Sequence, residues 1–326
     1  MTHAMTKWAA GALLGAAMVA APQAAFADDA YPSKPVQLIV PYNPGGDTDL
    51  LGRIFASELE KTLGEQVVVV NVAGASGSIA TTKVKDSAPD GYTMLFHHSG
   101  VLVSMLTGAI DFSYNDMTLL GSVGLSQGSI WVTGAGSPYQ TIEDVVKASK
   151  EAPGSVKMGV NFGSQTHVHA VAFERAADVK LHMIDVGGIG EKIVAILGGH
   201  VDATEVQAGT VTSYLESGDM RVLGTTAGER FDGMPDVATF SEQGVEVAMP
   251  DRIFWVAMPA GVSQDVIDTM TKAIQEAGAS ESLKAEYAKV KMTPMFLSAT
   301  ETAAYLDAEY QFNDGYKEVF LSKKKK

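Results

Sequence analysis

Residues 35–49, PVQLIVPYNPGGDTD, set the pattern that the rest of the chain follows. The apolar run from Pro35 predicts a buried strand, NPGGDTD predicts a turn, and apolar residues then recur at helical spacing from Leu50 to Leu59. The same order returns over 66–98: QVVVVNV is a predicted strand, GASG a loop, the residues from Ser78 a helix, and YTMLFHH a strand. Alternating strands and helices predict a parallel sheet covered by helices.

A second series with the same order occupies the middle of the chain. Thr141 is a predicted N-cap for the helix in TIEDVVKASK, VKMGVNF is a predicted strand, and THVHAVAFERAADV is a predicted helix. Three more strands, LHMIDV, VDATEV and RVLGTTA, accompany a helix over 187–197. The later strand IFWVAMP and the helices over 266–277 and 283–290 have no sheet of their own, so we expect the chain to return to the first lobe.

The expected fold is therefore α/β with two lobes, each a mainly parallel sheet flanked by helices. We assign residues 28–130 and 249–326 to lobe 1 and residues 131–248 to an inserted lobe 2, with a ligand cleft between the lobes. The two crossings, over 128–131 and 249–252, are the predicted hinges.

Composition narrows the class of protein. The 326 residues include 24 Lys plus Arg and 38 Asp plus Glu, a net charge of −14, so a nucleic-acid-binding role is disfavoured. The chain contains no cysteine, which excludes disulfides, thiolate metal sites and cysteine nucleophiles.

The first residues have the features of a secretory signal peptide. Lys7 precedes an apolar run from Trp8 to Ala21, and the small-residue site Ala25-Phe26-Ala27 follows. The run is shorter than a membrane-spanning helix requires. We expect residues 1–27 to be removed by cleavage after Ala27, and the mature protein to reside in the periplasm. The C-terminal run Lys323 to Lys326 is interpreted as a solvated tail.

Four loops each follow a predicted strand and open a predicted helix: 43–49, 74–78, 163–167 and 187–190. In open α/β sheets ligands bind beyond the carboxyl ends of the strands, where helix N-termini attract anions. Two facing lobes would make an anion-binding cleft from these loops. Any one loop alone is explained equally well by the need for glycine in turns and for helix caps, and no phosphate-binding or dinucleotide-binding motif is present.

Histidines and a serine raise two further possibilities. His167 and His169, like His97 and His98, are too few and too poorly spaced for a metal site, so we predict no metal and no cofactor. Ser164 and His167 suggest a Ser/His hydrolase, but no G-x-S-x-G elbow is present and Ser164 stands at a helix-cap position. We therefore predict no catalytic residues and no enzyme activity.

Charged residues near the loops are few. Asp47 and Asp49 lie at a helix start, where capping is their expected role, although Asp47 is also a candidate selector of a ligand amino or hydroxyl group. Arg53 and Arg175 fall inside helices, and Arg252 is the arginine placed to reach a cleft. Anion binding would then rest mainly on backbone N–H groups and neutral side chains.

Taken together, YPSKPVQLIVPYNPGGDTDLLGR, LGEQVVVVNVAGASGSIA and APDGYTMLF resemble the substrate-binding proteins of tripartite tricarboxylate transporters, the Bug-type periplasmic receptors. DMTLLGSV, the GSQTH loop, GGIGEKIVAILGGHVDA, MPDVATFSEQGVEV and MPAGVSQDVIDTM continue the likeness in the order of that family. The resemblance covers essentially the whole mature chain.

The resemblance implies a type II periplasmic-binding-protein fold, a Venus flytrap that closes on a small carboxylate and presents it to a membrane permease, as a monomer. It implies that the loops at 42–49 and 163–167 hold one carboxylate, partly through ordered water. The ligand-binding candidates are then Tyr42, Asn43, Gly45, Gly46, Asp47, Thr48, Ala75, Ser76, Gly163, Ser164, Gln165, Thr166 and His167, with Ser99 and Asp185 near the distal pocket.

Three departures from the family pattern leave the substrate open. Asp47 stands where the family often has a small residue, Val72-Ala73 replaces the commoner Arg-Pro, and Asp185 stands where many members have tyrosine. The ligand could be a dicarboxylate, a tricarboxylate, an amino acid or an aromatic acid. A secreted Ser/His hydrolase and a sensory module that signals carboxylate binding to a partner are the alternative functions.

Overall fold

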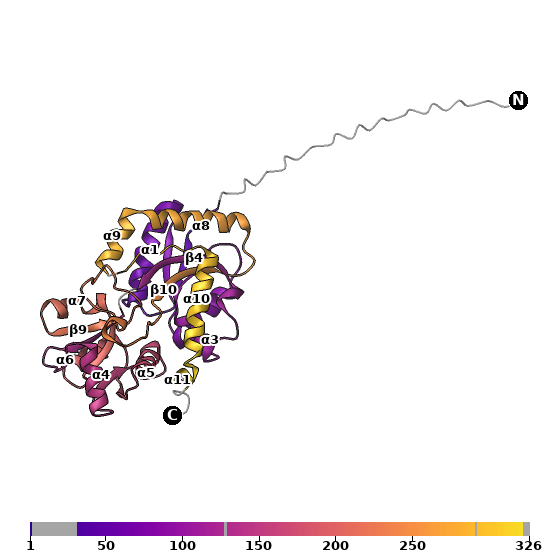
Figure 1. Ribbon diagram of the computed structural model, residues 1–326. Coiled ribbons are helices and arrows are strands. Elements are labelled where there is room, and N and C mark those ends of the chain that lie inside the picture. The colour runs from indigo at the N-terminus through magenta and orange to yellow at the C-terminus, as the bar shows by residue number, and fades with distance from the viewer. Residues whose placement is uncertain (2–30, 127–128, 291, 322–326) are drawn as a thin grey trace. The chain divides into compact units, whose positions relative to one another are not determined.

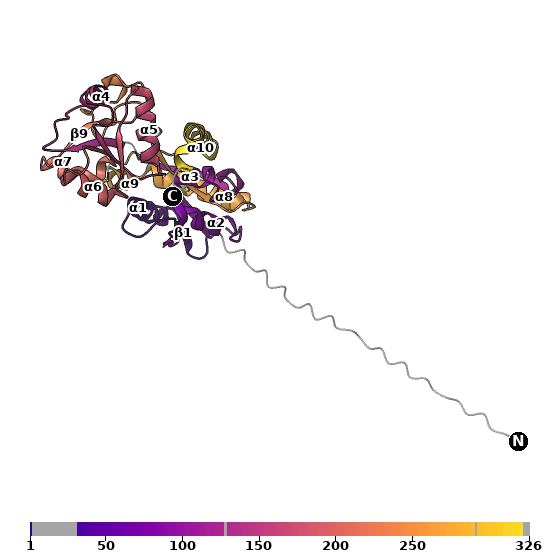
Figure 2. The ribbon, with the colours of Figure 1, turned by 90° about the horizontal axis from the view of Figure 1, so that it is seen from below.

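The computed structural model describes residue 1 and residues 31–126, 129–290 and 292–321. The predicted signal peptide beyond Met1, residues 127–128 at the first predicted hinge, and the C-terminal lysine run lie outside these residues. The described elements form two five-stranded sheets with helices packed against them (Figures 1 and 2). The two-lobed α/β fold expected from the sequence is confirmed.

The first sheet has the strand order β2-β1-β3-β10-β4. Its strands are β1 (Val36–Val40), β2 (Val67–Asn71), β3 (Thr93–His98), β4 (Thr118–Ser126) and β10 (Arg252–Met258). β1 pairs in parallel with β2 and β3, whereas β10 is antiparallel to both β3 and β4. The sheet is therefore mainly parallel, and β10 is its one reversed strand.

Both faces of this sheet are buried, which explains why its central strands are almost continuously apolar. Leu38 and Phe254 belong to the core under α1 (Asp47–Leu63), α8 (Gln264–Ala279) and α9 (Glu281–Lys289). Ile39 and Trp255, one position along each strand, belong to the core on the opposite face. The helices associated with that side are α2 (Ser78–Lys85), α3 (Gly100–Leu106) and α10 (Ala299–Asp314).

The second sheet repeats the arrangement with the order β7-β6-β8-β5-β9. Its strands are β5 (Ser129–Gly134), β6 (Lys157–Val160), β7 (His182–Asp185), β8 (Ala203–Gln207) and β9 (Met220–Thr225). Its helices are α4 (Ile142–Glu151), α5 (Gln165–Ala177), α6 (Ile189–Leu197) and α7 (Ala208–Glu216). The predicted N-cap of α4 is confirmed, because the Thr141 hydroxyl accepts a hydrogen bond from the Asp144 amide at 3.1 Å.

The reversed strand of each sheet is the one that arrives from the other sheet. The chain enters the second sheet with β5, directly after β4, and returns to the first sheet with β10, after β9. β5 is antiparallel to its neighbours β8 and β9. β10 is likewise antiparallel to its neighbours β3 and β4. The start of each reversed strand therefore lies at the carboxyl ends of its parallel neighbours. The two segments that connect the sheets, between β4 and β5 and between β9 and β10, therefore lie near the strand-to-helix loops at the carboxyl ends of the parallel strands.

The last helix of the described chain contacts one helix beside each sheet. α11 (Lys317–Leu321) contacts α3 and α5, and Val319 and Phe320 pack with Val168 of α5 and Leu106 of α3. Short 3-10 turns lie at Ala75–Gly77 (η1), Tyr114–Asp116 (η2) and Ser241–Gln243 (η3). None of the helices in the described segments is both long and apolar enough to span a bilayer.

Candidate ligand-binding site

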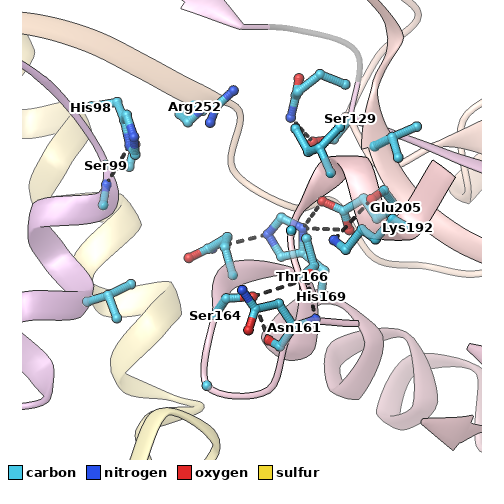
Figure 3. A pocket seen from close by; sticks show the side chains of 18 of the residues that line it. His98, Ser99, Ser129, Asn161, Ser164, Thr166, His169, Lys192, Glu205 and Arg252 are labelled. Carbon is cyan, nitrogen blue, oxygen red and sulfur yellow. Dashed lines mark hydrogen bonds and ion pairs between the residues drawn. The ribbon is translucent and has the colours of Figure 1, made fainter. Parts of the chain in front are cut away.

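A cavity of about 320 Å³ is lined by the carboxyl-end loops of both sheets (Figure 3). From the first sheet, Tyr42 follows β1, Ser99 follows β3, and Arg252 begins β10. α10 contributes Glu309. The second sheet and its loops and helices contribute Ser129, Asn161, Gly163, Ser164, Gln165, Thr166, His169, Gly187, Gly188, Ile189, Lys192, Glu205, Val206 and Gln207. This is the position at which open α/β sheets bind ligands.

The structure brings part of the predicted set together in this cavity: Tyr42, Ser99, Gly163, Ser164, Gln165 and Thr166. Gly45, Gly46 and Asp47 line a second cavity of about 250 Å³, which shares Gln207 and Arg252 with the first. Asn43, Thr48, Ala75, His167 and Asp185 line neither cavity. Ser76 lies in η1, and its side chain is outside the described part of the chain.

The loop before α5 presents neutral donors to the cavity. Gly163 has a φ of 74°, a left-handed conformation that favours glycine and lets the chain turn from β6 into the helix. Ser164 occupies the N-cap position, yet its hydroxyl does not cap the helix; it donates instead to the Asn161 carbonyl at 2.6 Å. No side chain caps α5, and the His167 amide donates to the Ser164 carbonyl at 3.1 Å, so the amides of Gln165 and Thr166 are the ones at the start of the helix that can bind an anion.

The hydrolase arrangement does not form. The His167 Nδ1 accepts a hydrogen bond from the Gly163 amide at 3.2 Å, and its ring lies against Phe162. The Ser164 hydroxyl contacts Asn161 and Thr166 rather than the imidazole. Among the described residues, the hydrogen bonds of Ser164 and His167 therefore do not pair this hydroxyl with the imidazole that would activate it.

A buried polar network lines the second-sheet side of the cavity. The Gln165 amide nitrogen lies 2.9 Å from Asn313 Oδ1 and 3.1 Å from His169 Nε2. Because an amide NH₂ only donates, Nε2 accepts, and the proton of His169 belongs on Nδ1. Nδ1 lies 2.9 Å and 3.0 Å from the two Glu205 carboxylate oxygens, to which it donates.

Glu205 and Lys192 are charged groups inside this wall. Burial raises the pKa of Glu205, but His169 and Lys192 outweigh it and hold the pKa below its usual range. Lys192 is only 3% exposed, and its Nζ donates to the backbone carbonyl of Glu205 at 3.2 Å. Burial lowers the pKa of Lys192 to about 8, although the Glu205 charge acts in the opposite direction. Lys192 is therefore mainly a cation at neutral pH.

The first-sheet side of the cavity carries an ion pair. Arg252 binds the Asp47 carboxylate, which also accepts a hydrogen bond from the Thr48 amide at 2.7 Å. Burial raises the pKa of Asp47, but the Arg252 charge and the hydrogen bond from the Thr48 amide outweigh burial and lower the pKa to about 2. The capping role expected for Asp47 is wrong, because Gly46 holds the N-cap position of α1 and no side chain caps this helix. The Asp47 carboxylate instead neutralises the arginine of the cavity wall.

The rings of Tyr42 and His98 stack beside the ion pair of Arg252 and Asp47. Their rings stack with centroids 4.9 Å apart, and His98 Nδ1 accepts a hydrogen bond from the Gly100 amide at 2.8 Å. Burial, and then the nearby Arg252 charge, lower the pKa of His98 well below its usual range. The imidazole is therefore neutral and contributes shape rather than charge.

Glu309 of α10 and Ser99 complete the cavity with unused polar atoms. Glu309 Oε2 and Ser99 Oγ are both buried without a hydrogen bond of good geometry among the described residues, and the Ser99 hydroxyl lies close enough to the Glu309 carboxyl to oppose the effect of burial on its pKa. Burial raises the pKa of Glu309 to about 8, so that the carboxyl group is mainly neutral at pH 7. Both groups can serve as hydrogen-bond donors to a ligand.

Several lining residues were outside the sequence-based set. The sequence pattern does not single out Lys192, Glu205 or Glu309, and it indicates His169 only as a possible metal ligand. Two features of the sequence could have indicated these residues. The predicted strand VDATEV contains a charged residue, and a lysine lies one turn into the helix that follows the loop at 187–190. In the described segments, no three His, Cys, Asp or Glu side chains are grouped as a metal site would require.

A family model described as "Tripartite tricarboxylate transporter family receptor" matches residues 51–314. The chain belongs to this family. Protein BugT of Bordetella pertussis is 31% identical over 309 residues, covering 92% of this chain and 93% of BugT. The resemblance seen in the sequence is thereby confirmed, and receptors of this family are periplasmic solute-binding proteins.

Solved structures agree with this assignment. A TctC solute-binding protein from Polaromonas is 26% identical with a TM-score of 0.75, and the match covers 87% of this chain and 98% of that chain. MatC from Rhodopseudomonas palustris, solved with bound malate, is 20% identical with a TM-score of 0.70, covering 86% and 99%. This second likeness shows a common fold.

Proposed function

We propose that this receptor captures a small organic carboxylate in the 320 Å³ cavity and delivers it to the permease of a tripartite tricarboxylate transporter. The observation that carries the proposal is the cavity itself, which is lined by the carboxyl-end loops of both sheets and by the uncapped N-terminus of α5. A helix N-terminus in this position favours an anion through its free amides and its dipole. Two solved structures that share this fold, MatC with bound malate and R. palustris Rpa4515 with adipate, carry carboxylate ligands, which supports the same ligand chemistry here.

The loop at 161–166 is the proposed site of the first carboxylate. It combines the amides at the start of α5 with the hydroxyl groups of Ser164 and Thr166. Across the cavity, Tyr42 and Ser99 supply hydroxyl groups from the first sheet. A ligand held between these groups contacts elements of both sheets.

Binding is proposed to close two lobes, 28–130 with 249–326 and 131–248, about the crossings between them. A ligand that touches both lobes favours the closed state by its greater affinity for that state, and a permease can then recognise closure. We propose that the receptor works as a monomer in the periplasm after cleavage behind Ala27.

The alternative functions are a Ser/His hydrolase and a sensory module. The Ser164 and His167 geometry gives no support to a hydrolase, because their side chains are hydrogen-bonded to other groups. A sensory role uses the same cavity and closure. Uptake of the bound carboxylate in a strain that lacks the permease separates the two, since a transport receptor requires the permease and a sensor does not.

The test is a thermal-shift screen of the mature protein, unfolded and refolded beforehand to remove any bound ligand. The panel contains malate, adipate, citrate, glutamate and benzoate, each paired with the amide that replaces a carboxylate. A ligand at 100 times its Kd stabilises the folded state by about 2.7 kcal/mol, which raises Tm by several degrees. A shift with one class of acid and none with its amide supports the proposal. A flat response from refolded protein to every acid would contradict it.

A further inference from the structure

We propose that the ion pair of Arg252 and Asp47 limits the length of the acid that this receptor accepts, because the pair separates the cavity of about 320 Å³ from the second cavity of about 250 Å³. The inference rests on the proposed function and deepens it, since it concerns the chain of the acid and not the hold on its carboxyl group. Arg252 and Gln207 are the two described residues that line both cavities, so they form the wall between these spaces.

Gln207 is fixed in this wall by two hydrogen bonds. Its Oε1 accepts from the Ser126 hydroxyl at 2.8 Å, and its Nε2 donates to the Ser129 hydroxyl at 2.9 Å. Ser126 ends β4 and Ser129 begins β5, so Gln207 is held at the place where the chain crosses from one sheet to the other. This half of the wall is part of the framework of the fold.

Arg252 forms the other half, and Asp47 holds its guanidinium in place. Arg252 begins β10, and its Nη2 donates to the Asp47 carboxylate, while its Nε is buried without a hydrogen-bond partner in the described part of the chain. The guanidinium carbon lies 5.3 Å from the centroid of the Phe254 ring. The Asp47 carboxylate is itself fixed at the start of α1 by the Thr48 amide, at 2.7 Å. Arg252 and Asp47 together therefore span the gap that Gln207 leaves.

The space behind this wall suits a hydrocarbon chain. Its two cations are already paired, Arg252 with Asp47 and Lys289 with Glu286. Much of its remaining described lining is apolar: Leu50, Leu51, Ala208, Val290 and Met292. Without the wall, the methylene groups of a longer acid could enter this space while its carboxylate stays at the start of α5.

The experiment measures the affinities of unbranched acids of increasing length by isothermal titration calorimetry on refolded mature protein. The probes are butanoate, hexanoate, octanoate and decanoate, and the diacids succinate, adipate, suberate and sebacate, which have the same numbers of carbon atoms. For the wild type we expect affinity to fall about tenfold or more between the six-carbon and the ten-carbon acid of the series that binds more tightly, because the added methylene groups overfill the closed cavity.

Asp47→Ala combined with Arg252→Ala removes the wall without leaving an unpaired charge. A buried methylene group strengthens binding by about fourfold, so the ten-carbon acid should gain about tenfold or more relative to the six-carbon acid. Arg252→Ala alone is the second variant if the double variant does not fold.

Asp47→Asn combined with Arg252→Met is the matched control, because it removes both charges and keeps most of the bulk of the wall. Its preference between the two lengths should stay within about threefold of that of the wild type, as for other substitutions that conserve volume. Lys272→Ala combined with Glu276→Ala removes an exposed ion pair of α8 that lines neither cavity, and should leave the preference unchanged.

A wild type that binds the ten-carbon acid as tightly as the six-carbon acid would overturn the inference. A folded alanine variant with the length preference of the wild type would do the same. An equal gain in the asparagine and methionine control would also overturn it, since charge and not the wall would then set the limit. Binding of none of these acids by any of the proteins would count against the inference too, and only together with a flat thermal-shift screen would it overturn the proposed function.

Discussion

His97 in β3 should make the stability of this receptor strongly dependent on acid pH. The imidazole has no exposed surface, stacks on Trp255 with centroids 5.7 Å apart, and accepts a hydrogen bond from the His98 amide at 2.7 Å through Nδ1. Burial lowers the pKa of His97 to about 3, despite that hydrogen bond. The folded chain therefore keeps His97 neutral at pH values at which the unfolded chain protonates it.

The magnitude follows from proton linkage. The unfolded imidazole has a pKa of about 6.5, so at pH 5 it gains about 2 kcal/mol from protonation that the folded state does not share. At pH 7.5 the corresponding gain is close to zero. The contribution of His97 to the free energy of unfolding is thus fully present above pH 6.5 and is lost as pH falls toward 3. The value at pH 5 hardly depends on the folded pKa, which lies well below that pH.

His97→Asn tests this reasoning, because the amide oxygen can accept the His98 amide in place of Nδ1 and cannot be titrated. The variant loses stability at every pH through the space left beside Trp255. However, the drop in unfolding free energy from pH 7.5 to pH 5, measured by urea denaturation, should be about 2 kcal/mol smaller than in the wild type. His200→Asn, at an exposed histidine, should leave the drop unchanged.

Equal drops in the wild type and in His97→Asn would refute the argument, since the buried imidazole would then have no effect on proton uptake. The neighbouring His98 is retained in both proteins, so its similar depression of pKa cancels in the comparison.

Three further predictions concern the cavity and the fold. Asp47→Asn removes the counter-charge of Arg252 and should lower the free energy of unfolding by about 1–2 kcal/mol. The loss is smaller than for a fully buried pair because both side chains are partly exposed. An unchanged midpoint of urea denaturation would show that the pair contributes nothing to stability. The affinity for a carboxylate, measured by calorimetry, should weaken as pH rises from 7 to 9. Near pH 8 Lys192 loses its positive charge and Glu309 gains a negative charge. A constant affinity would mean that neither group interacts electrostatically with the ligand. Thr141→Ala removes the cap of α4 and should cost about 1 kcal/mol in thermal or urea unfolding, and no loss would show that the amide finds another partner.

Much of the fold could be predicted because its signals are local. Apolar runs, glycine turns and the Thr141 cap are each contained in a few residues, and the expected strands and helices from β1 to α2 and from α4 to α6 are present. The elements that the pattern does not reveal are β4, β5, α3, α7, α10 and α11.

The sequence of β4, TLLGSVGLS, contains two glycines and two serines and does not show the pattern of a buried strand. Gly121 carries no side chain because the Leu297 carbonyl of a distant segment occupies the space where its Cβ would be. Ser122 is buried and donates to the Met295 carbonyl at 2.5 Å. Their identity is set by packing against a segment 173 residues away in the chain, and no local sequence pattern reveals that contact.

The residues of the binding site also differ in whether a local sequence pattern reveals them. Ser164 and Thr166 lie in a strand-to-helix loop, which the sequence marks with glycine, so they could be found. Lys192 and Glu205 lie inside a helix and a strand, and their meeting depends on how α6 packs beside β8. Their charge was visible in the sequence, but their shared position on a cavity wall was not.

The most direct measurement of the central claim is a crystal structure of the refolded mature protein with the carboxylate that gives the largest thermal shift. The ligand should lie in the 320 Å³ cavity, with one carboxylate on the amides that begin α5 and contacts to both sheets. A ligand bound elsewhere, or held in that cavity with its carboxylate in bulk solvent, would contradict the proposed binding mode.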